Sequence, residues 1–430
     1  MAEKNVFQST LISIHDVVRK HFDSRKGIRL TKEYADHAFF DKIECILSAV
    51  LAIKNYQHIL TSLSYALREL ITNANKANMK RVFFRLNNMQ INVPSDYENG
   101  MKAFTETLVS NPQKIEVYLK DYKKYVEITF NEFADNKFSV SIINNSPFNH
   151  DERERIIKRL EYFNMLKTNT QMLLDCYDQS EGAGVGLITS LKLLEQVGIK
   201  SSSLTLAVEG DRTIAKIEFD YSKISPPPYS ELATEILKRL KALPKYPENI
   251  KRIIAKLNDP NIDSNSLESD ILRDPTLSAE LLKLVNSSEF MLVRKIASIK
   301  EAINIVGVNG LRNLIYTNEA IKILNKRFGS IPDIWEHCIK AAQLSSKLAK
   351  LKKIRKYQDE VFTAGLLHDI GKIVLMSFDS TKARRIEKAC LKKGMSLPIM
   401  EEILMGLSHA KIGGEIAKFW EFPESLVNAI

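Results

Sequence analysis

Three consecutive prolines, Pro226–Pro228, constrain the fold more than any other feature of the sequence. Each proline fixes its φ angle and lacks a backbone N–H, so neither a helix interior nor a central strand can pass through the run. Before it, residues 202–221 alternate apolar and polar side chains around Gly210-Asp211, which predicts a β-hairpin. After it, amphipathic helical periods continue to Ile430. We therefore interpret residues 223–230 as a linker between two domains.

Length and composition agree with two globular domains. The chain has 430 residues, of which 44% are hydrophobic and 27% charged, enough apolar material for more than one core. Glycine and proline are sparse, so helix should exceed strand. The net charge of +10 fits either an anionic partner or, as we favour, a solvated lysine-rich surface. No nucleic-acid motif accompanies it, so we expect no nucleic-acid partner.

The cysteines and the N-terminus bear on the compartment. The four cysteines are far apart and form no CxxC pair, which is typical of a reducing environment. The first ten residues contain no apolar signal core. The most apolar run, Cys45–Ile53, is shorter than the ~20 residues that span a bilayer. The sequence therefore predicts a cytoplasmic protein without a membrane segment. It leaves open the oligomeric state and whether the chain continues past Ile430.

The first half is predicted to be an α+β layer structure. Apolar residues at spacings of three and four predict helix over residues 6–78. Strands are predicted at 81–86 (RVFFRL), 125–133 (YVEITFNEF) and 137–144 (KFSVSIIN), and further helices at 151–175 and 186–197. Together with the hairpin, these strands predict a mainly antiparallel sheet.

The second half carries a series of motifs in a fixed order. Asp274-Pro275 is a helix start, in which an N-cap acceptor precedes a proline at the first helical position. The other motifs are Leu243-Pro244-Lys245-Tyr246-Pro247, Asn286-Ser287-Ser288, Ile299–Gly307, Trp335-Glu336-His337, Phe362–Lys372, His409–Gly413 and Trp420-Glu421-Phe422-Pro423. This order and spacing resemble the HDOD (HD-related output domain) family. The resemblance implies an all-α domain over residues 231–430.

The resemblance also implies a candidate metal site. His368 and Asp369 are adjacent at the end of an apolar helix, and His337 lies on the preceding helix. In the wider HD phosphohydrolase superfamily, such groups bind a divalent metal that activates water and polarises a phosphate. His409 matches a further histidine of related two-metal enzymes, and Lys372 would balance phosphate charge.

One departure weakens the hydrolase interpretation. The superfamily's metal site is normally completed by a later aspartate, and this chain has no Asp after Asp379. The candidates to replace it are Glu401, Glu402 and Glu415, which nothing in the sequence assigns to the site. Three alternatives remain open: a buried hydrogen-bonded cluster, which we favour, metal binding without turnover, and phosphohydrolysis. HDOD domains as a family are signalling and protein-interaction modules, which favours a protein that is not an enzyme.

Two segments of the first half indicate a nucleotide site. Glu69 and Asn73 lie four residues apart on one helix face. Gly182, Gly184 and Gly186 open a later helix, where backbone N–H groups can receive phosphate.

The pair of segments resembles the histidine-kinase-type (GHKL) ATPase fold over residues 55–222, preceded by a helical segment at 1–54 and interrupted by an insertion at about 95–115. The resemblance implies ATP or ADP with Mg²⁺, ligated by Asn73, with Glu69 assisting catalysis. Asn144 replaces the carboxylate that reads adenine, and Ser146 and Phe148 replace glycines.

The sequence thus predicts a two-module signal transducer. A nucleotide-sensing first domain would alter a non-catalytic HDOD output domain, whose partners would be other signalling proteins. The alternative is a metal-dependent HD-type phosphohydrolase or phosphodiesterase acting on a nucleotide.

Overall fold

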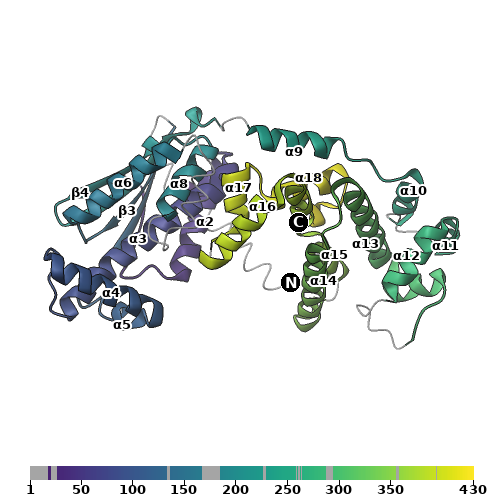
Figure 1. Ribbon diagram of the computed structural model, residues 1–430, viewed down its shortest axis with the longest axis horizontal. Helices are drawn as coiled ribbons and strands as arrows, with labels where there is room; N and C mark the ends of the chain where they lie inside the picture. Colours follow the sequence, from purple (N-terminus) through teal and green to yellow (C-terminus); the bar gives the residue numbers. More distant parts are fainter. Residues whose placement is uncertain are drawn as a thin grey trace. The chain divides into compact units, whose positions relative to one another are not determined.

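The chain forms two compact units, Met1–Pro228 and Tyr229–Ile430 (Figure 1). The three prolines of the predicted linker lie outside the described residues. The computed structural model describes residues 18–20, 27–132, 136–166, 185–225, 229–257, 259, 262, 264–286, 294–354, 358–393 and 395–430.

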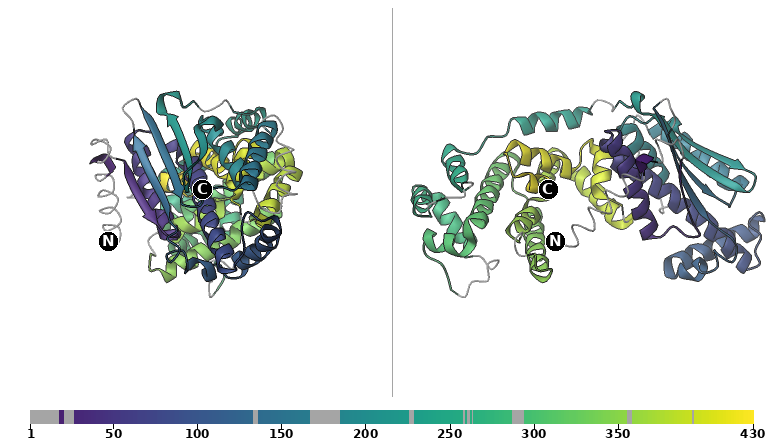
Figure 2. Two further views of the ribbon diagram at one scale, coloured as in Figure 1. Left: turned by 90° about the vertical axis from the view of Figure 1, so that its left-hand side faces the viewer. Right: turned by 180° about the vertical axis from the view of Figure 1, so that it is seen from behind.

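The first unit is built around a five-stranded antiparallel sheet, which the right-hand view of Figure 2 shows from its edge. Its strands are β1 (Ile28–Lys32), β2 (Val126–Glu132), β3 (Lys137–Asn144), β4 (Leu204–Glu209) and β5 (Arg212–Asp220). They lie in the order β1-β2-β3-β5-β4, and every neighbouring pair is antiparallel. The predicted hairpin is confirmed, because Glu209 pairs with Arg212 across a turn in which Gly210 has a φ of 60°.

Helices cover this sheet on one side. They are α2 (His37–Ile53), α3 (Leu60–Leu86), α4 (Pro94–Ser110), α5 (Gln113–Glu116), α6 (His150–Leu166) and α8 (Val185–Gln196), with short 3-10 turns η1 (Gln57–Ile59), η2 (Ser201–Ser203) and η3 (Tyr221–Lys223). Helix α3 packs on β2 and β3, and α8 packs on α3. Alternate residues of β3, including Phe138, Val140 and Ile142, are buried beneath them.

Two secondary-structure predictions for this unit are wrong. Residues 81–86, predicted as a strand, form the last turns of α3. Val82, Phe83 and Phe84 are all buried, because α4 and α5 cover the end of α3 on several sides, and such a continuous apolar run resembles a buried strand. Residues 28–32, predicted as helix, form the edge strand β1, which is defined by its pairing with β2.

The second unit is helical among its described residues (Figure 1). Its helices are α9 (Glu231–Lys241), α10 (Glu248–Leu257), α11 (Ser264–Leu272), α12 (Pro275–Val285), α13 (Ile299–Phe328), α14 (Pro332–Leu351), α15 (Gln358–Leu367), α16 (Ile370–Lys393), α17 (Leu397–Met405), α18 (His409–Phe419) and α19 (Glu424–Val427). The predicted helix start is confirmed, since Asp274 Oδ1 accepts a hydrogen bond from the Leu277 N–H at 3.0 Å.

An aromatic cluster joins the two ends of this unit. The Trp420 indole stacks on Tyr246 with ring centroids 5.3 Å apart, and its Nε1 donates to the Pro244 carbonyl at 3.2 Å. Tyr246 Oη in turn donates to the Tyr316 carbonyl at 2.9 Å. Phe422 packs against Tyr316. These contacts explain why aromatic and proline motifs recur at both ends of the second half of the sequence.

One stretch of the described chain, Glu360–Lys392, is long and apolar enough to be considered as a membrane span. Half of it is buried inside the unit, and it is divided between α15 and α16 by the turn at His368 and Asp369. The core helices of globular proteins have the same composition. The stretch is therefore weak evidence for a membrane segment.

Candidate functional site

Helix α14 and two helix junctions of the second unit bring the predicted metal-site residues together. His337 lies on α14, and His368 and Asp369 form the turn between α15 and α16. His409 is the first residue of α18, whose N-cap, Ser408, accepts a hydrogen bond from the Lys411 N–H. Helix ends present side chains and backbone groups that are not committed to intrahelical bonds. His368, Asp369 and His409 thus lie where helices begin and end, whereas His337 lies in the second turn of α14.

Two glycines allow these helices to approach closely. A Cβ atom on Gly365 would lie 2.7 Å from Ala342 Cα, so the glycine lets α15 pack directly against α14. A Cβ atom on Gly371 would lie 1.9 Å from the His409 carbonyl oxygen, so α16 touches the first turn of α18 there. Larger residues at either position would separate the elements that carry the histidines and Asp369.

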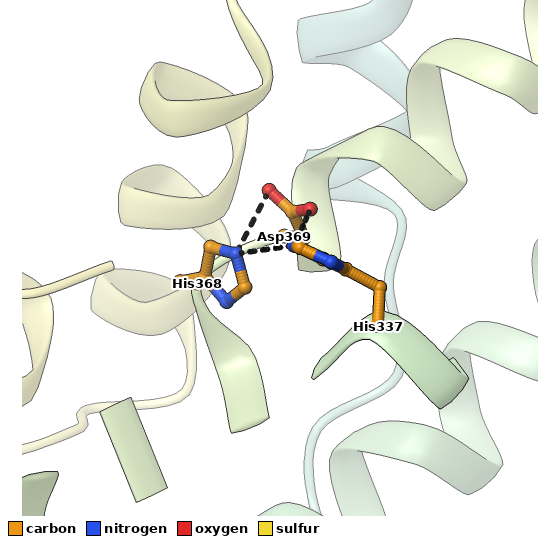
Figure 3. Close-up of side chains that lie close together, drawn as sticks. All are labelled: His337, His368 and Asp369. Carbon is orange, nitrogen blue, oxygen red and sulfur yellow. Dashed lines mark hydrogen bonds and ion pairs between the residues drawn. The ribbon is translucent and has the colours of Figure 1, made fainter. Parts of the chain in front are cut away.

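The nitrogen and oxygen atoms of the cluster converge on one point (Figure 3). His337 Nε2 lies 3.3 Å from His368 Nε2 and 3.4 Å from Asp369 Oδ2. His368 Nε2 lies 3.4 Å from Asp369 Oδ1. Asp369 is 2% exposed, whereas 58% of the His337 side chain is exposed. The cluster therefore has a buried anion at its base and opens toward solvent at His337.

His409 and Glu401 extend the cluster on its buried side. His409 Nε2 lies 3.4 Å from Asp369 Oδ1. Its other ring nitrogen, Nδ1, lies 2.5 Å from Glu401 Oε2, which also accepts the His409 backbone N–H at 2.8 Å. Glu401 therefore orients His409 and does not itself reach the centre. Glu402 instead accepts from Ser408 Oγ at 3.0 Å, and Glu415 pairs with Lys418.

The sequence named Glu401 as a candidate replacement ligand without placing it, and the structure puts it behind His409. Glu401 is buried, on the same face of α17 as Met400 and Leu404. That face is visible in the sequence, because Leu397, Glu401 and Leu404 follow helical spacing. A glutamate in an apolar stripe is a signal that it has a buried partner, but the identity of the partner depends on how α17 packs against α18.

Hydrogen bonds on the outer side of the cluster determine where the imidazole protons lie. His368 Nδ1 lies 2.8 Å from the Gly365 carbonyl, which only accepts, so Nδ1 carries the proton. The same reasoning assigns the proton of His409 to Nδ1, which faces the Glu401 carboxylate. In the neutral rings, both Nε2 lone pairs then face the Asp369 carboxylate. Acceptors that face one another in this way repel unless a proton or a metal cation lies between them.

Lys372 and a small cavity border the cluster. Lys372 Nζ lies 2.7 Å from Asp369 Oδ2 and is mostly buried. Burial, with a further contribution from the charge of Asp369, raises the pKa of the neighbouring Cys338 thiol to about 12, so Cys338 is a neutral packing residue. The cavity has a volume of about 130 Å³ and is lined by Ile331, Asp333, Ile334, His337, Asp369, Lys372, Met376, Arg384 and Glu387.

The predicted nucleotide-site residues are only partly described. Asn73 Nδ2 donates to Glu69 Oε1 at 3.2 Å on the exposed face of α3. A Cβ atom on Gly186 would lie 2.1 Å from the Glu69 carboxyl carbon, so the first turn of α8 packs directly against this glutamate. The structure thus brings Glu69, Asn73 and Gly186 together. Gly182 and Gly184 lie outside the described residues.

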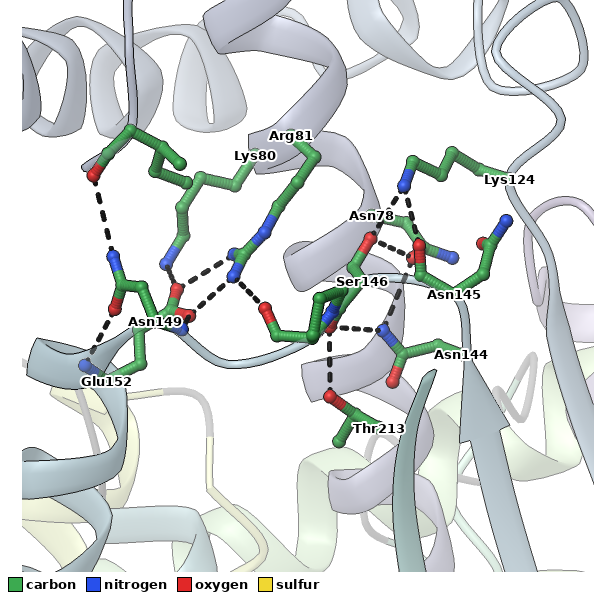
Figure 4. A network of polar contacts seen from close by, with 12 residues as sticks. Asn78, Lys80, Arg81, Lys124, Asn144, Asn145, Ser146, Asn149, Glu152 and Thr213 are labelled. Atoms are coloured by element: carbon green, nitrogen blue, oxygen red, sulfur yellow. Dashed lines mark hydrogen bonds and ion pairs between the residues drawn. The ribbon is translucent and has the colours of Figure 1, made fainter. Parts of the chain in front are cut away.

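Asn144, predicted to read adenine, belongs to a buried polar network (Figure 4). Its Nδ2 donates to Asn78 Oδ1 at 3.3 Å, and Asn78 Oδ1 also accepts from Ser146 Oγ at 2.8 Å. Lys124 Nζ donates to Ser146 Oγ at 3.0 Å, and Thr213 Oγ1 donates to the Ser146 carbonyl at 2.9 Å. This network holds the end of β3 against α3 and β5. The side-chain amide of Asn144 is therefore already used in a structural hydrogen bond.

Beside it, a second group of charged residues anchors α6. Glu152 accepts from Arg81 Nη2 at 2.6 Å and from Lys80 Nζ at 2.5 Å (Figure 4). Burial opposes ionisation of Glu152, but the hydrogen bond from Arg81 and the charges of both cations outweigh it and lower the pKa of Glu152 to about 2. Burial also lowers the pKa of Lys80. We therefore assign this ion pair a structural role.

Comparisons with known proteins identify the second unit. Residues 243–430 match the family model of the HDOD domain. An uncharacterized protein of Treponema pallidum (strain Nichols) is 28% identical over 416 residues, covering 96% of this chain and 80% of its own length.

Solved structures add two similar proteins. An HDOD domain protein of unknown function from Geobacter sulfurreducens is 28% identical, with a TM-score of 0.38, over 46% of this chain and 66% of that chain. A provisionally assigned phosphohydrolase from Shewanella amazonensis SB2B is also 28% identical, with a TM-score of 0.37, over 45% of this chain and 69% of that chain. The comparisons give no support to the predicted ATPase resemblance of residues 55–222. They do confirm the prediction for the second half of the sequence: residues 243–430 are an HDOD domain.

Proposed function

We propose that this is a signal-transduction protein whose HDOD domain binds one divalent transition-metal ion and serves as a non-catalytic output domain. The ligands would be His337, His368 and Asp369, with His409 as a fourth donor. Imidazole with one carboxylate suits zinc, iron or manganese. When bound, the ion would supply a charge that holds α14, α15 and α18 in one arrangement.

The observation that carries this proposal is the spacing of the donor atoms. His337 Nε2 lies 3.3 Å from His368 Nε2 and 3.4 Å from Asp369 Oδ2, and His368 Nε2 lies 3.4 Å from the other carboxylate oxygen, Oδ1. Metal–ligand bonds of about 2.1 Å in a tetrahedron place the ligand atoms about 3.4 Å apart. The Nε2 lone pairs of His368 and His409 also face the Asp369 carboxylate, since Gly365 and Glu401 accept the Nδ1 protons of these two rings.

A single ion, and not a pair, is favoured by Lys372. Its ammonium lies 2.7 Å from Asp369 Oδ2 and already neutralises part of the charge of this carboxylate. A second metal ion on the same carboxylate would face a buried cation. This arrangement supports a regulatory or structural ion more than a two-metal catalytic centre.

The test is metal analysis of the purified full-length protein. We expect close to one equivalent of zinc, iron or manganese per chain, and loss of this metal in His368→Ala. His150→Ala, at an exposed histidine of the first unit, is the matched control and should retain the metal. The proposal would be contradicted if the purified protein held less than one equivalent of metal and added zinc did not raise this content. It would also be contradicted if His368→Ala held as much metal as the unchanged protein.

A phosphohydrolase is the second candidate, favoured by the cavity beside the cluster. Lys372 and Arg384 line this cavity together with His337 and Asp369, and cations beside a metal site suit a phosphate ester. The discriminating assay supplies manganese or zinc and measures release of phosphate from nucleoside monophosphates and hydrolysis of cyclic dinucleotides. Turnover that is lost in His368→Ala would favour the enzyme over the non-catalytic output domain.

For the first unit, nucleotide sensing remains a proposal, supported by the contact of Glu69 with Gly186 and by its hydrogen bond with Asn73. The burial of Asn144 weighs against it. Titration calorimetry with Mg-ATP and Mg-ADP tests binding, and the absence of both heat and a thermal shift would end this proposal. If nucleotide binds, unchanged hydrogen exchange in residues 230–430 would exclude coupling between the two domains.

A further inference from the structure

Helix α14 of the HDOD domain has two apolar faces, and only one of them is packed within the domain. Ile334, Cys338, Ala342 and Ala349 are buried, and Ala342 lies against Gly365 of α15, which lies beside α14 in Figure 1. On the opposite side, Leu344, Leu348 and Leu351 are 60%, 58% and 77% exposed. Isolated exposed leucines are ordinary, but three on one face of one helix form a patch.

The spacing of this second face is that of a helix-pairing seam. His337, Ala341, Leu344, Leu348 and Leu351 follow one another at intervals of four, three, four and three residues. This is the a/d repeat with which one helix packs against another. We call these five residues the α14 seam. It spans about 21 Å along the helix at 1.5 Å per residue, which matches a partner helix of about four turns.

The charges that flank the seam are all of one sign. Lys340 and Lys347 occupy the positions before Ala341 and Leu348, and Lys352 follows Leu351. All three lysines are exposed, although Lys340 pairs with Glu336 at 2.5 Å. No acidic residue occurs between Glu336 and Asp359. Charges beside an a/d seam select the charge of the partner helix.

We propose that the α14 seam binds an amphipathic helix of another protein, with leucine-like residues in a/d spacing and glutamate or aspartate at the flanking positions. This deepens the proposed output role of the HDOD domain by naming the docking surface and the partner's chemistry. It does not depend on the metal ion, although the seam begins at His337, the exposed member of the metal cluster.

Two other occupants fit less well. A lipid bilayer favours a helix with a wide apolar face, whereas the seam is narrow and is bordered by Gln343 and Ser345 on one helix turn. A second copy of the chain would set the same lysines against one another, which is repulsive. Both alternatives give distinct results in the experiment below.

The experiment uses the full-length protein and a fluorescein-labelled peptide of three heptads, with leucine at a and d and glutamate at e and g. The glutamates keep the peptide from pairing with itself. Fluorescence anisotropy should show saturable binding that weakens as salt is raised. The double variant Leu344→Glu/Leu348→Glu should weaken binding by about tenfold or more. Because both leucines are exposed, this variant should retain its fold, which circular dichroism checks.

Matched controls make the result decisive. Leu391→Glu changes a leucine that is 80% exposed on α16 and should bind the peptide like the unchanged protein. A peptide with lysine in place of glutamate should not bind. The proposal is overturned if the acidic peptide does not bind, or if it binds the double variant equally. Leucine-dependent binding to phosphatidylglycerol vesicles, or a dimer that only the double variant abolishes, would also overturn it.

Metal content is measured on the same preparations. If the protein contains one equivalent of metal but does not bind the peptide, the docking surface is refuted and the metal proposal stands. Conversely, peptide binding in metal-free protein would support the seam while the metal proposal fails.

Discussion

At the scale of single residues, the function of the candidate site depends on side chains that lie behind the ligands. His409 faces Asp369 only because Glu401 holds its other ring nitrogen. Groups of this kind fix the tautomer and orientation of a metal-binding imidazole. The ion pairs of Glu152 perform a comparable orienting role in the first unit, where they hold α6 against α3.

Glu401→Gln should weaken metal binding without unfolding the HDOD domain. Glutamine has nearly the same shape but lacks the charge that orients His409, so we expect zinc affinity to fall by about 10- to 100-fold. Competition titration against a chromophoric chelator measures this change. Glu402→Gln, at the adjacent residue that contacts Ser408, is the control and should bind zinc normally. Equal affinities in the two variants would show that Glu401 has no orienting role.

Glu152 should make the first unit less stable as the pH is lowered. Its carboxyl pKa is lowered to about 2 in the folded protein, from an ordinary value of 4.5, so its ionised form favours folding. This contribution is complete above pH 4.5 and is lost as the pH falls through about 2. Burial of the Lys80 ammonium offsets part of this contribution. Glu152→Gln should therefore lower the free energy of unfolding by up to about 3 kcal/mol at pH 7.

The same comparison at low pH provides the check. At pH 3 the difference in unfolding free energy between Glu152→Gln and the unchanged protein should shrink by roughly half. Hydrogen exchange of peptides from β2 and β3 reports this unit specifically. A difference that stays constant between pH 7 and pH 3 would show that the charge of Glu152 does not contribute.

At the scale of secondary-structure elements, close helix approach creates the metal cluster. Helices α14 and α15 meet where Gly365 lies against Ala342, and this contact sets the separation of His337 from His368. The α14 seam begins at His337 and continues along the same helix through the exposed leucines Leu344, Leu348 and Leu351. Helix α14 therefore connects the metal cluster, the α15 contact and the proposed docking surface.

Gly365→Ala should disrupt both packing and metal binding. The added methyl group would lie 2.7 Å from Ala342 Cα, so the helices must separate, at a cost of about 1–3 kcal/mol. The midpoint temperature of thermal unfolding and the amount of zinc bound per chain should both decrease. Gly414→Ala on α18, where an added Cβ meets no atom within 4 Å, is the matched control and should be neutral or slightly stabilising. A thermal midpoint unchanged by Gly365→Ala would contradict the close approach.

At the scale of the whole molecule, the two units should respond separately to metal. A ligand stabilises only the unit that binds it, by an amount that rises with its concentration. Both tryptophans of the chain, Trp335 and Trp420, lie in the second unit. Zinc should therefore shift the urea transition seen by tryptophan fluorescence. Hydrogen exchange in β2 and β3 should not change. Slower exchange in these strands on adding zinc would show that the units are energetically coupled.

The sequence by itself determined the features that depend on local chemistry. The Gly210 hairpin, the helix start at Asp274 and the ordered motifs of the HDOD domain could all be predicted, because each depends on residues that are close together in the sequence. The family resemblance then implied a candidate metal site of His337, His368, Asp369 and His409, because no local pattern assigns these residues to one site.

Only the tertiary structure decided the features that depend on what packs against a segment. Residues 28–32 are a strand because β2 pairs with them, and residues 81–86 are helical although their apolar run resembles a buried strand. Glu401 reaches His409 through the packing of α17 and α18, and Asn144 joins a network with Asn78 that lies 66 residues away in the chain. Burial and long-range contacts select among local preferences of similar free energy.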